Sequence, residues 1–162
     1  MLRRLLAALA LVAVGAAVAL ALHLATAKGD TMFAGKRPTY LGVKDGRLPR
    51  PRSTPNCVSS QADPADKEHY IEPIRFKGTA LQAIAAARKA VESMPRTTVI
   101  RNEGNYLYAE FKSQLLGFVD DVEFTYDEKA GVLHVRSASR LGRRDYGVNR
   151  ARVEQLRSRI AG

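Results

Sequence analysis

The chain has 162 residues and a formal net charge of +10 at pH 7, with 46% hydrophobic and 26% charged residues. Its length allows one domain of roughly a hundred residues behind a leader segment, which is enough for a single modest core. The composition excludes a disordered chain and a collagen-like repeat, because the apolar fraction is high and there are only 12 glycines.

Residues 1–27 have the pattern of an export segment. Arg3 and Arg4 precede an uncharged, largely apolar run from Leu5 to Ala27. The run is long enough to span a bilayer, whereas Ala25-Thr26-Ala27 has the form of a signal-peptidase cleavage site. Two alternatives therefore stay open: a membrane anchor facing the periplasm, or a cleaved signal peptide that releases a soluble periplasmic protein. Either one carries the rest of the chain across the cytoplasmic membrane.

Residues 28–68 are rich in proline and glycine and show no sustained periodicity, which predicts an extended arm. Pro55 and Asn56 favour a defined turn, so we expect the end of the arm, residues 55–60, to pack on the domain. This part holds Cys57, the single cysteine of the chain. In an exported protein a lone cysteine is either a free thiol or forms an intermolecular disulfide, and an inert buried thiol is favoured over a catalytic one.

Residues 69–162 predict an α+β domain. A strand at 71–76 is followed by a helix that Thr79 caps and Pro95 ends, with Leu81, Ile84, Arg88, Val91 and Met94 on its apolar stripe. Four more strands are predicted at 97–101, 106–113, 118–126 and 132–139. A closing helix follows, capped by Asp145 or Asn149, with Val153, Leu156 and Ile160 on its apolar face. The order β-α-β-β-β-β-α indicates a largely antiparallel five-stranded sheet with both helices on one face.

Strand alternation divides the side chains between the two faces of this sheet. The face away from the helices collects Tyr106, Tyr108, Glu110, Lys112, Asp121, Glu123, His134, Arg136 and Arg140. Asp120 falls on the apolar side, where a carboxylate needs a charged partner or backbone donors. We therefore expect a structural role for Asp120.

Four blocks, in order along the chain, resemble the family called domain of unknown function 1499. They are PNCVSS at 55–60, LYAEFKS at 107–113, GFVDDVEF at 117–124 and HVRSASRLGRRDYGVNRAR at 134–152. The resemblance spans about residues 48 to 157 and implies a small exported or membrane-attached protein without an established activity. Relatives carry a second cysteine shortly before the first block, where this chain has Arg50 or a neighbour, so the resemblance implies that no internal disulfide forms here.

The arginine-rich C-terminal stretch is the strongest indication of function. From Arg136 onward there are eight arginines and only two acidic residues, Asp145 and Glu154. Guanidinium groups bind phosphate or carboxylate in a bidentate manner, and serine and amide groups can add neutral donors. The predicted anion site comprises Arg136, Ser137, Ser139, Arg140, Asn149, Arg150 and Arg152. The alternatives are a solvated surface and internal pairing with Asp120, Asp121 and Glu123.

The polar sheet face suggests a second class of function. Asp121, Glu123 and His134 could serve a hydrolase, with Cys57 as a weaker catalytic candidate. With Glu110 these three residues could also bind a metal ion, but the nearby Arg136 favours a ladder of cross-strand ion pairs, so no metal is expected.

The sequence therefore predicts a non-enzymatic envelope protein that binds an anionic ligand, lipid headgroup or protein partner, with a hydrolase as the alternative. Export excludes nucleic acid as a partner and points to anionic lipid or acidic envelope components. No cofactor is expected.

Overall fold

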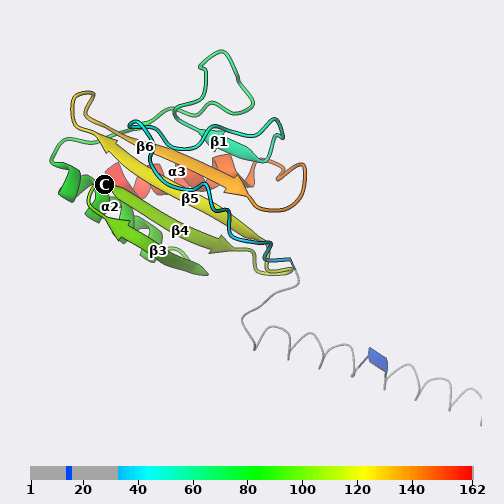
Figure 1. Cartoon of the computed structure of the whole chain (residues 1–162). Coiled ribbons are helices and arrows are strands. Elements are labelled where there is room, and N and C mark those ends of the chain that lie inside the picture. Colours follow the sequence, from blue (N-terminus) through cyan, green and yellow to red (C-terminus); the bar gives the residue numbers. More distant parts are fainter. Residues whose placement is uncertain (1–13, 16–32, 162) are drawn as a thin grey trace, which may run out of the picture. The chain divides into compact units, whose positions relative to one another are not determined.

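The structure is a computed structural model that describes residues 14–15 and 33–161 (Figure 1). The predicted leader, residues 1–27, lies outside this part except for Val14 and Gly15, which are helical. No helix among the described residues is long and apolar enough to cross a membrane. The chain divides into two compact units, residues 1–32 and 33–162. Strands β1–β6 and helices α2 and α3 all belong to the second unit.

The domain is an α+β structure built on a mostly antiparallel sheet. Its strands are β1 (Cys57–Ser59), β2 (Ile74–Arg75), β3 (Thr97–Glu103), β4 (Tyr106–Lys112), β5 (Val119–Asp127) and β6 (Val132–Ser139). The spatial order is β1-β6-β5-β4-β3. The short strand β2 pairs with the start of β6, next to the part of β6 that pairs with β1.

The sheet has six strands instead of the predicted five. The additional strand is β1, from the segment expected only to pack on the domain, and it pairs with residues 136–138 of β6. The predicted strand at 71–76 shrinks to β2, because Pro73 has no N–H to donate to a ladder. The predicted hairpin between β3 and β4 is confirmed and turns at Gly104 and Asn105.

Helix α2 (Ala80–Glu92) begins at the predicted cap. The Gln82 amide N–H donates to Thr79 Oγ1 at 3.3 Å, and the Thr79 N–H donates to Gln82 Oε1 at 2.9 Å, which completes a capping box. The predicted apolar stripe is partly wrong, because Leu81 is 77% exposed. The helix instead packs through its small residues, with Ala83, Ala87 and Ala90 buried beside Ile84 and Val91. Because alanine side chains are small, the backbone of α2 can lie close to the sheet on its alanine side. The buried face of α2 is therefore centred on the alanines and not on the predicted stripe.

Helix α3 (Val148–Ala161) closes the domain. Of the two predicted caps, Asp145 is the one observed: its Oδ2 accepts from the Asn149 N–H at 2.8 Å. Asn149 lies inside the helix and is fully buried. The predicted apolar face is confirmed, because Val153, Leu156 and Ile160 belong to the main core.

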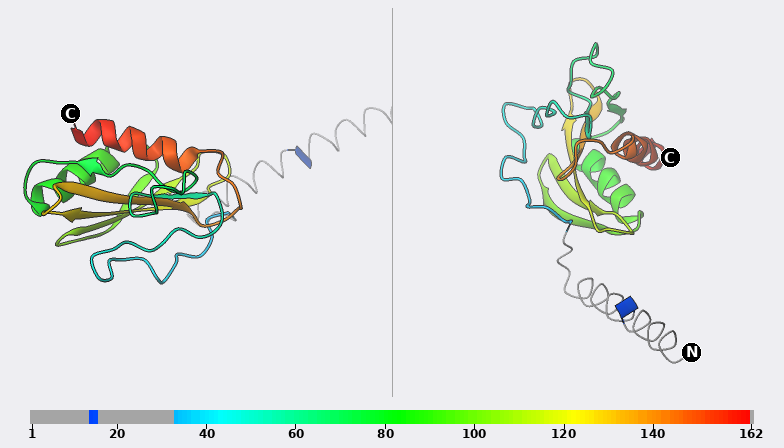
Figure 2. Two further views of the ribbon diagram at one scale, coloured as in Figure 1. Left: turned by 90° about the horizontal axis from the view of Figure 1, so that it is seen from above. Right: turned by 90° about the vertical axis from the view of Figure 1, so that its right-hand side faces the viewer.

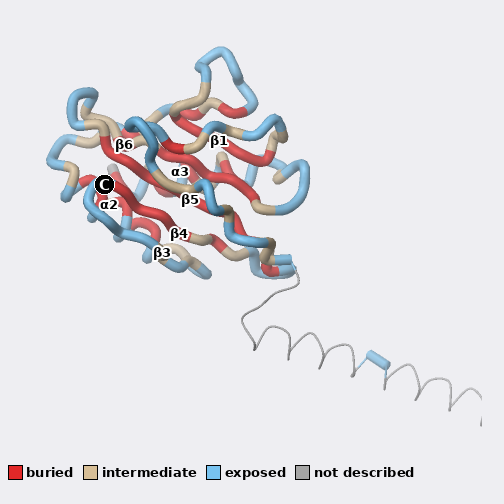
Figure 3. Tube along the Cα trace, viewed as in Figure 1, coloured by how far each residue is buried: buried red, intermediate tan, exposed pale blue. Residues whose placement is uncertain are grey.

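Both helices cover one face of the sheet, as predicted (Figure 2). A segment ahead of β1, residues 33–52, runs along the opposite face, and we call it the covering segment. Leu41 and Leu48 pack there against Tyr106 and Tyr108 in a small second cluster. The central strands are therefore buried on both sides (Figure 3).

Candidate functional site

The polar side chains of β4, β5 and β6 lie in a layer between the sheet and the covering segment. Register pairs Glu123 with Arg136 across β5 and β6, and Tyr108 with Glu123 across β4 and β5. Alternation points these residues away from the helices, as the sequence predicts. The layer is not open to solvent, because Tyr106, Tyr108, Asp121, Glu123 and Arg136 are all buried.

Glu123 is the centre of the first group in this layer. Its Oε2 accepts from Arg136 Nη1 at 3.0 Å, and the two side chains are 0% and 1% exposed. Its Oε1 accepts from the Tyr106 hydroxyl and from the backbone N–H of Gly42, both at 2.8 Å. Burial raises the pKa of Glu123, against the lowering effect of Arg136 and the two other donors. Through Gly42, this carboxylate fixes the covering segment to the sheet.

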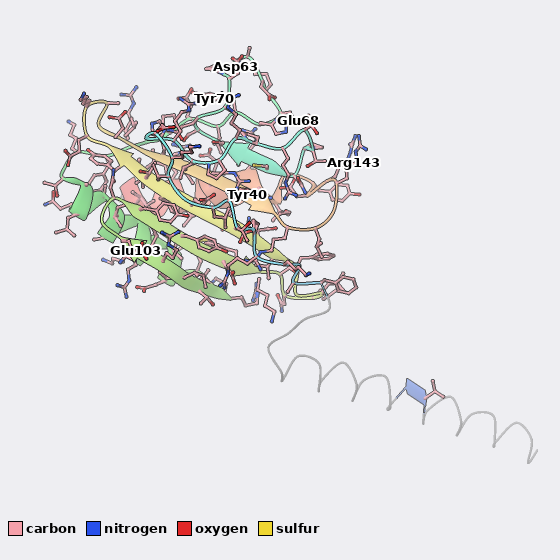
Figure 4. The ribbon with its side chains drawn as sticks, viewed as in Figure 1. Tyr40, Asp63, Glu68, Tyr70, Glu103 and Arg143 are labelled. Carbon is pink, nitrogen blue, oxygen red and sulfur yellow. The ribbon has the colours of Figure 1, made fainter. Side chains whose placement is uncertain are left out.

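The cation of this pair is only partly engaged. Arg136 Nε and Nη2 are buried without a hydrogen-bond partner in the described part of the chain. The Tyr40 ring lies 5.9 Å from the guanidinium carbon, and Figure 4 shows Tyr40 in front of the sheet. Cys57 is a free buried thiol on the same face of the sheet, and burial raises its pKa. A high thiol pKa makes this cysteine a poor nucleophile.

Arg140 is the centre of the second group. Its Nε lies 3.1 Å from both oxygens of Asp121, and its Nη2 donates to Asp121 Oδ1 at 2.7 Å and also to Glu110. Tyr108 donates to Asp121 Oδ1 at 2.6 Å. Arg37 of the covering segment donates to Glu110 Oε1 at 2.6 Å. Despite burial, these donors lower the pKa of Glu110. Glu110 is thus a second carboxylate, after Glu123, that fixes the covering segment to the sheet.

The helix side of the sheet holds a separate polar group. Asp120 is buried, and its Oδ2 accepts from Arg152 Nη2 at 2.6 Å. Arg152 Nη1 donates to Asn149 Oδ1 at 2.7 Å and to Ser137 Oγ at 3.1 Å. Asn149 Nδ2 donates to Ser139 Oγ at 2.9 Å. This network joins α3 to β5 and β6.

The structure does not bring the predicted C-terminal binding residues to one place. Arg136 and Arg140 lie under the covering segment, whereas Arg152 lies on the helix side, and each is paired with a carboxylate. Arg150 Nη2 donates to the carbonyls of Lys67 and Glu68 at 3.3 and 3.2 Å. Ser137, Ser139 and Asn149 are buried and engaged with one another. Arg140 and Arg152 are thus held by carboxylates, whereas Arg136 Nε and Nη2 have no partner among the described residues but are buried, so no open anion site forms there.

The predicted hydrolase residues are also separated. Asp121 and Glu123 belong to different ion-paired groups, and His134 Nδ1 lies 3.2 Å from Ser60 Oγ instead. Burial lowers the pKa of His134. The described residues contain no group of three histidine, cysteine or acidic side chains placed to hold a metal ion.

A surface hollow that the sequence prediction missed lies beside the covering segment. It has a volume of about 670 Å³, and its lining includes Arg47, Arg50, Arg52, Gln61 and His69. Arg47 Nη2 donates to the Gln61 carbonyl at 2.7 Å, and Arg52 Nη2 donates to the Ser139 carbonyl at 2.9 Å. None of the three arginines forms an ion pair within the described residues, and Arg50 makes no hydrogen bond there.

The sequence RLPRPR at residues 47–52 carries the pattern that could have pointed to this hollow. Pro49 and Pro51 hold their own φ near −65° and bias the residues before them toward extended backbone. Alternation with proline therefore keeps the arginines apart along a stiff segment, so that they do not collapse against nearby carboxylates.

The hollow also contains a titratable group. His69 is buried, with Nδ1 2.7 Å from Asp66 Oδ2 and Nε2 3.2 Å from the Thr54 carbonyl. Both ring nitrogens can donate only when the imidazole is protonated. Burial opposes that charge, but the two acceptors outweigh it and raise the pKa of His69. The Asp66 carboxylate is thus hydrogen-bonded to His69. Asp63, the other acid that lines the hollow, accepts from the Ala65 N–H at 2.9 Å.

Comparison with known proteins identifies the family. A family model described as a protein of unknown function (DUF1499) matches residues 47–160. The match covers most of the chain and includes residues 47–52 with their three arginines, all six strands and most of α3. The chain therefore belongs to this family. No curated protein matches the chain.

Proposed function

We propose that this member of the DUF1499 family is a non-enzymatic module that, once exported, binds a phosphate or carboxylate group in the hollow formed by Arg47, Arg50 and Arg52. One observation carries the proposal: the three arginines line one hollow, and none of them is paired with a carboxylate of residues 33–161. Of the predicted C-terminal arginines, Arg136, Arg140 and Arg152 pair with carboxylates, and for this reason we assign the binding site to the covering segment instead.

The positions of these guanidinium groups support binding of an anion. Within the described residues, the Arg47 guanidinium donates to one carbonyl and the Arg52 guanidinium donates to another. Each guanidinium therefore keeps donors for a ligand. A guanidinium offers five N–H donors in a planar fork that matches the oxygens of phosphate and carboxylate. His69, which is hydrogen-bonded to Asp66, also lines the hollow. The exported module that we propose would meet anionic lipid headgroups and acidic envelope polymers, which carry such groups.

The test uses the full chain in neutral detergent at low ionic strength, titrated calorimetrically with inorganic phosphate and with citrate. Replacing Arg50 with Gln removes one charge without breaking a hydrogen bond or ion pair of the described residues, so we expect affinity to fall about tenfold or more. Arg47→Gln and Arg52→Gln should act in the same direction. The preferred probe distinguishes a phosphate ligand from a carboxylate ligand.

Arg75→Gln is the matched control, because Arg75 is also exposed and makes no ion pair within the described residues but lies outside this hollow. Circular dichroism verifies that each variant is folded. Absence of saturable binding of both anions by the unmodified chain would refute the proposal. An equal loss of affinity in Arg75→Gln would show that binding is only a response to net charge.

A further inference from the structure

Six large hydrophobic residues are exposed at one end of the domain. Soluble proteins seldom expose a large apolar patch without a function for it. They are Phe33, Leu115, Leu116, Leu141, Tyr146 and Val148, and we call this group the apolar tip. Leu115 and Tyr146 are the most exposed, at 88% and 95%. A single exposed leucine is ordinary on a protein surface, but a group from three separate segments calls for an explanation.

The topology places these segments at the same end of the sheet. Asp120 at the start of β5 pairs with Ser139 at the end of β6, so the β4–β5 turn and the loop after β6 share one end. Leu115 and Leu116 lie in that turn, and Leu141 and Tyr146 lie in that loop. Figure 1 shows both connections at the end of the sheet where the covering segment begins.

The start of the covering segment is fixed to this same end. The Phe33 ring lies 5.2 Å from the Phe118 ring. Gly35 has φ +66°, and a Cβ there would lie 3.0 Å from Arg140 Cβ and 3.1 Å from Leu141 Cγ. The backbone at Gly35 therefore packs directly on the β6–α3 loop. Phe33 joins the two other segments in one surface.

Basic side chains accompany the tip. Arg143 and Arg144 are exposed in the β6–α3 loop and make no ion pair among the described residues, and Lys36 is exposed in the covering segment. Figure 4 shows Arg143 at the edge of the domain. The acid in the loop, Asp145, is used as the α3 cap. The tip thus combines exposed Leu, Phe and Tyr side chains with basic side chains that make no ion pair in the part of the chain that the structure describes.

We propose that the apolar tip docks on an anionic lipid bilayer. Its composition is that of interfacial protein segments, in which leucine and aromatic side chains enter the headgroup region and arginine binds anionic lipid. Chain connectivity supports a bilayer as the partner. Only five residues separate Phe33 from Ala27, the last residue of the apolar leader, and six extended residues span at most about 20 Å. The proposal rests on export of the chain with the leader still attached as a membrane anchor, but not on anion binding by Arg47, Arg50 and Arg52.

The chain has no tryptophan, so one introduced tryptophan reports on one position. The full chain carrying Leu115→Trp is reconstituted in vesicles of phosphatidylcholine, with or without phosphatidylglycerol. Leu81→Trp is the matched control, since Leu81 is 77% exposed but lies on α2, away from the tip. In vesicles with phosphatidylglycerol, we expect a blue shift of the Leu115→Trp emission and strong quenching by brominated acyl chains. The Leu81→Trp emission should show neither.

A double variant, Arg143→Gln with Arg144→Gln, in the Leu115→Trp background tests the basic component. We expect it to reduce the quenching in vesicles with phosphatidylglycerol, and high salt should have the same effect. Equal quenching of the two tryptophans, or no quenching of Leu115→Trp in either vesicle, would overturn the proposal. A blue shift that appears in detergent and grows with protein concentration would assign the tip to a second copy of the chain and overturn docking on lipid. Anion binding in the hollow is measured without vesicles, so the two proposals fail independently.

Discussion

The two faces of the sheet are buried in different ways. The face toward α2 and α3 is covered by apolar side chains, with Ile84, Val91 and Leu156 packed on the strands. The opposite face is covered by an irregular segment over ion pairs, of which Glu123–Arg136 is the most deeply buried. Burial of apolar side chains is non-directional and does not depend on one particular partner, whereas a buried charge requires a partner of opposite charge. We therefore expect the polar face to depend on single residues far more than the helix face does.

The largest effect is expected from breaking the pair under the covering segment. Glu123→Ala leaves the Arg136 guanidinium buried without its counter-charge, and the free energy of unfolding should fall by about 3–5 kcal/mol. Urea denaturation measures the change. Glu103→Gln is the control, because Glu103 pairs with Arg101 at an exposed edge of the sheet and no measurable change is expected. A loss in Glu123→Ala no larger than in this control would remove the contrast between buried and surface pairs.

The next effect concerns Asp120, the carboxylate that pairs with Arg152 on the helix side of the sheet. Asp120→Asn keeps the shape of the side chain but removes the charge opposite Arg152, so we expect a loss of about 1.5–3 kcal/mol in the free energy of unfolding. Glu154→Gln makes the same charge change in the exposed pair with Arg157 on α3 and should have little effect. Unchanged stability of Asp120→Asn in thermal unfolding would show that this carboxylate does not hold α3 to the sheet.

A smaller effect is expected where the covering segment starts. Gly35→Ala places a methyl group against Leu141 and forces a left-handed backbone on alanine, which costs about 1–2 kcal/mol for the backbone alone. Gly46→Ala has a similar φ of +74° with no atom within 4 Å, so it carries only the backbone cost. Hydrogen exchange of the Gly42 amide, which donates to Glu123, reports on the covering segment. We expect faster exchange in Gly35→Ala than in Gly46→Ala, and equal rates would contradict a tight contact at Gly35.

The smallest effect is a dependence on pH. The pKa of His69 is raised in the folded state, so its protonated form stabilises the fold at low pH, and this contribution is lost as the pH rises through the raised pKa. His134 acts in the opposite direction, because burial lowers its pKa and its contribution is lost as the pH falls. Denaturation of the unmodified chain and of Asp66→Asn between about pH 6 and pH 8 separates the two. Stability lost by Asp66→Asn should be larger at the lower pH, and a loss independent of pH would rule out a charged His69.

The helix face could be predicted from the sequence because its determinants are local. Val132–Ser139 is found with its predicted bounds, and Thr79 caps α2 as its position indicates. The apolar residues of α3 recur at helical spacing and therefore identify its buried side. The errors on this side are small: Leu81 stays exposed because alanines set the contact face.

The polar face could be predicted only in part. Alternation indicates that Asp121 and Glu123 share a face, but it gives no sign that the covering segment buries them. That cover depends on contacts far apart in sequence, such as the Gly42 amide with Glu123 and Arg37 with Glu110. Strand β1 is only three residues long and exists through its pairing with β6, so its sequence has too little periodicity to reveal it. The sequence does name Asp120, Asp121 and Glu123 as alternative partners of the C-terminal arginines, but it does not decide between internal pairing and an anion site.

The arginines fall into two classes, and phosphate titration observed by NMR at the arginine Nε–H groups distinguishes them. Arg47, Arg50 and Arg52 are exposed and make no ion pair within the described residues, whereas Arg136, Arg140 and Arg152 are held by carboxylates. The resonances of the first three should move in a saturable manner, and those of the second three should stay in place. Movement of the Arg136, Arg140 or Arg152 resonances, with no change in those of Arg47, Arg50 and Arg52, would refute anion binding in the hollow.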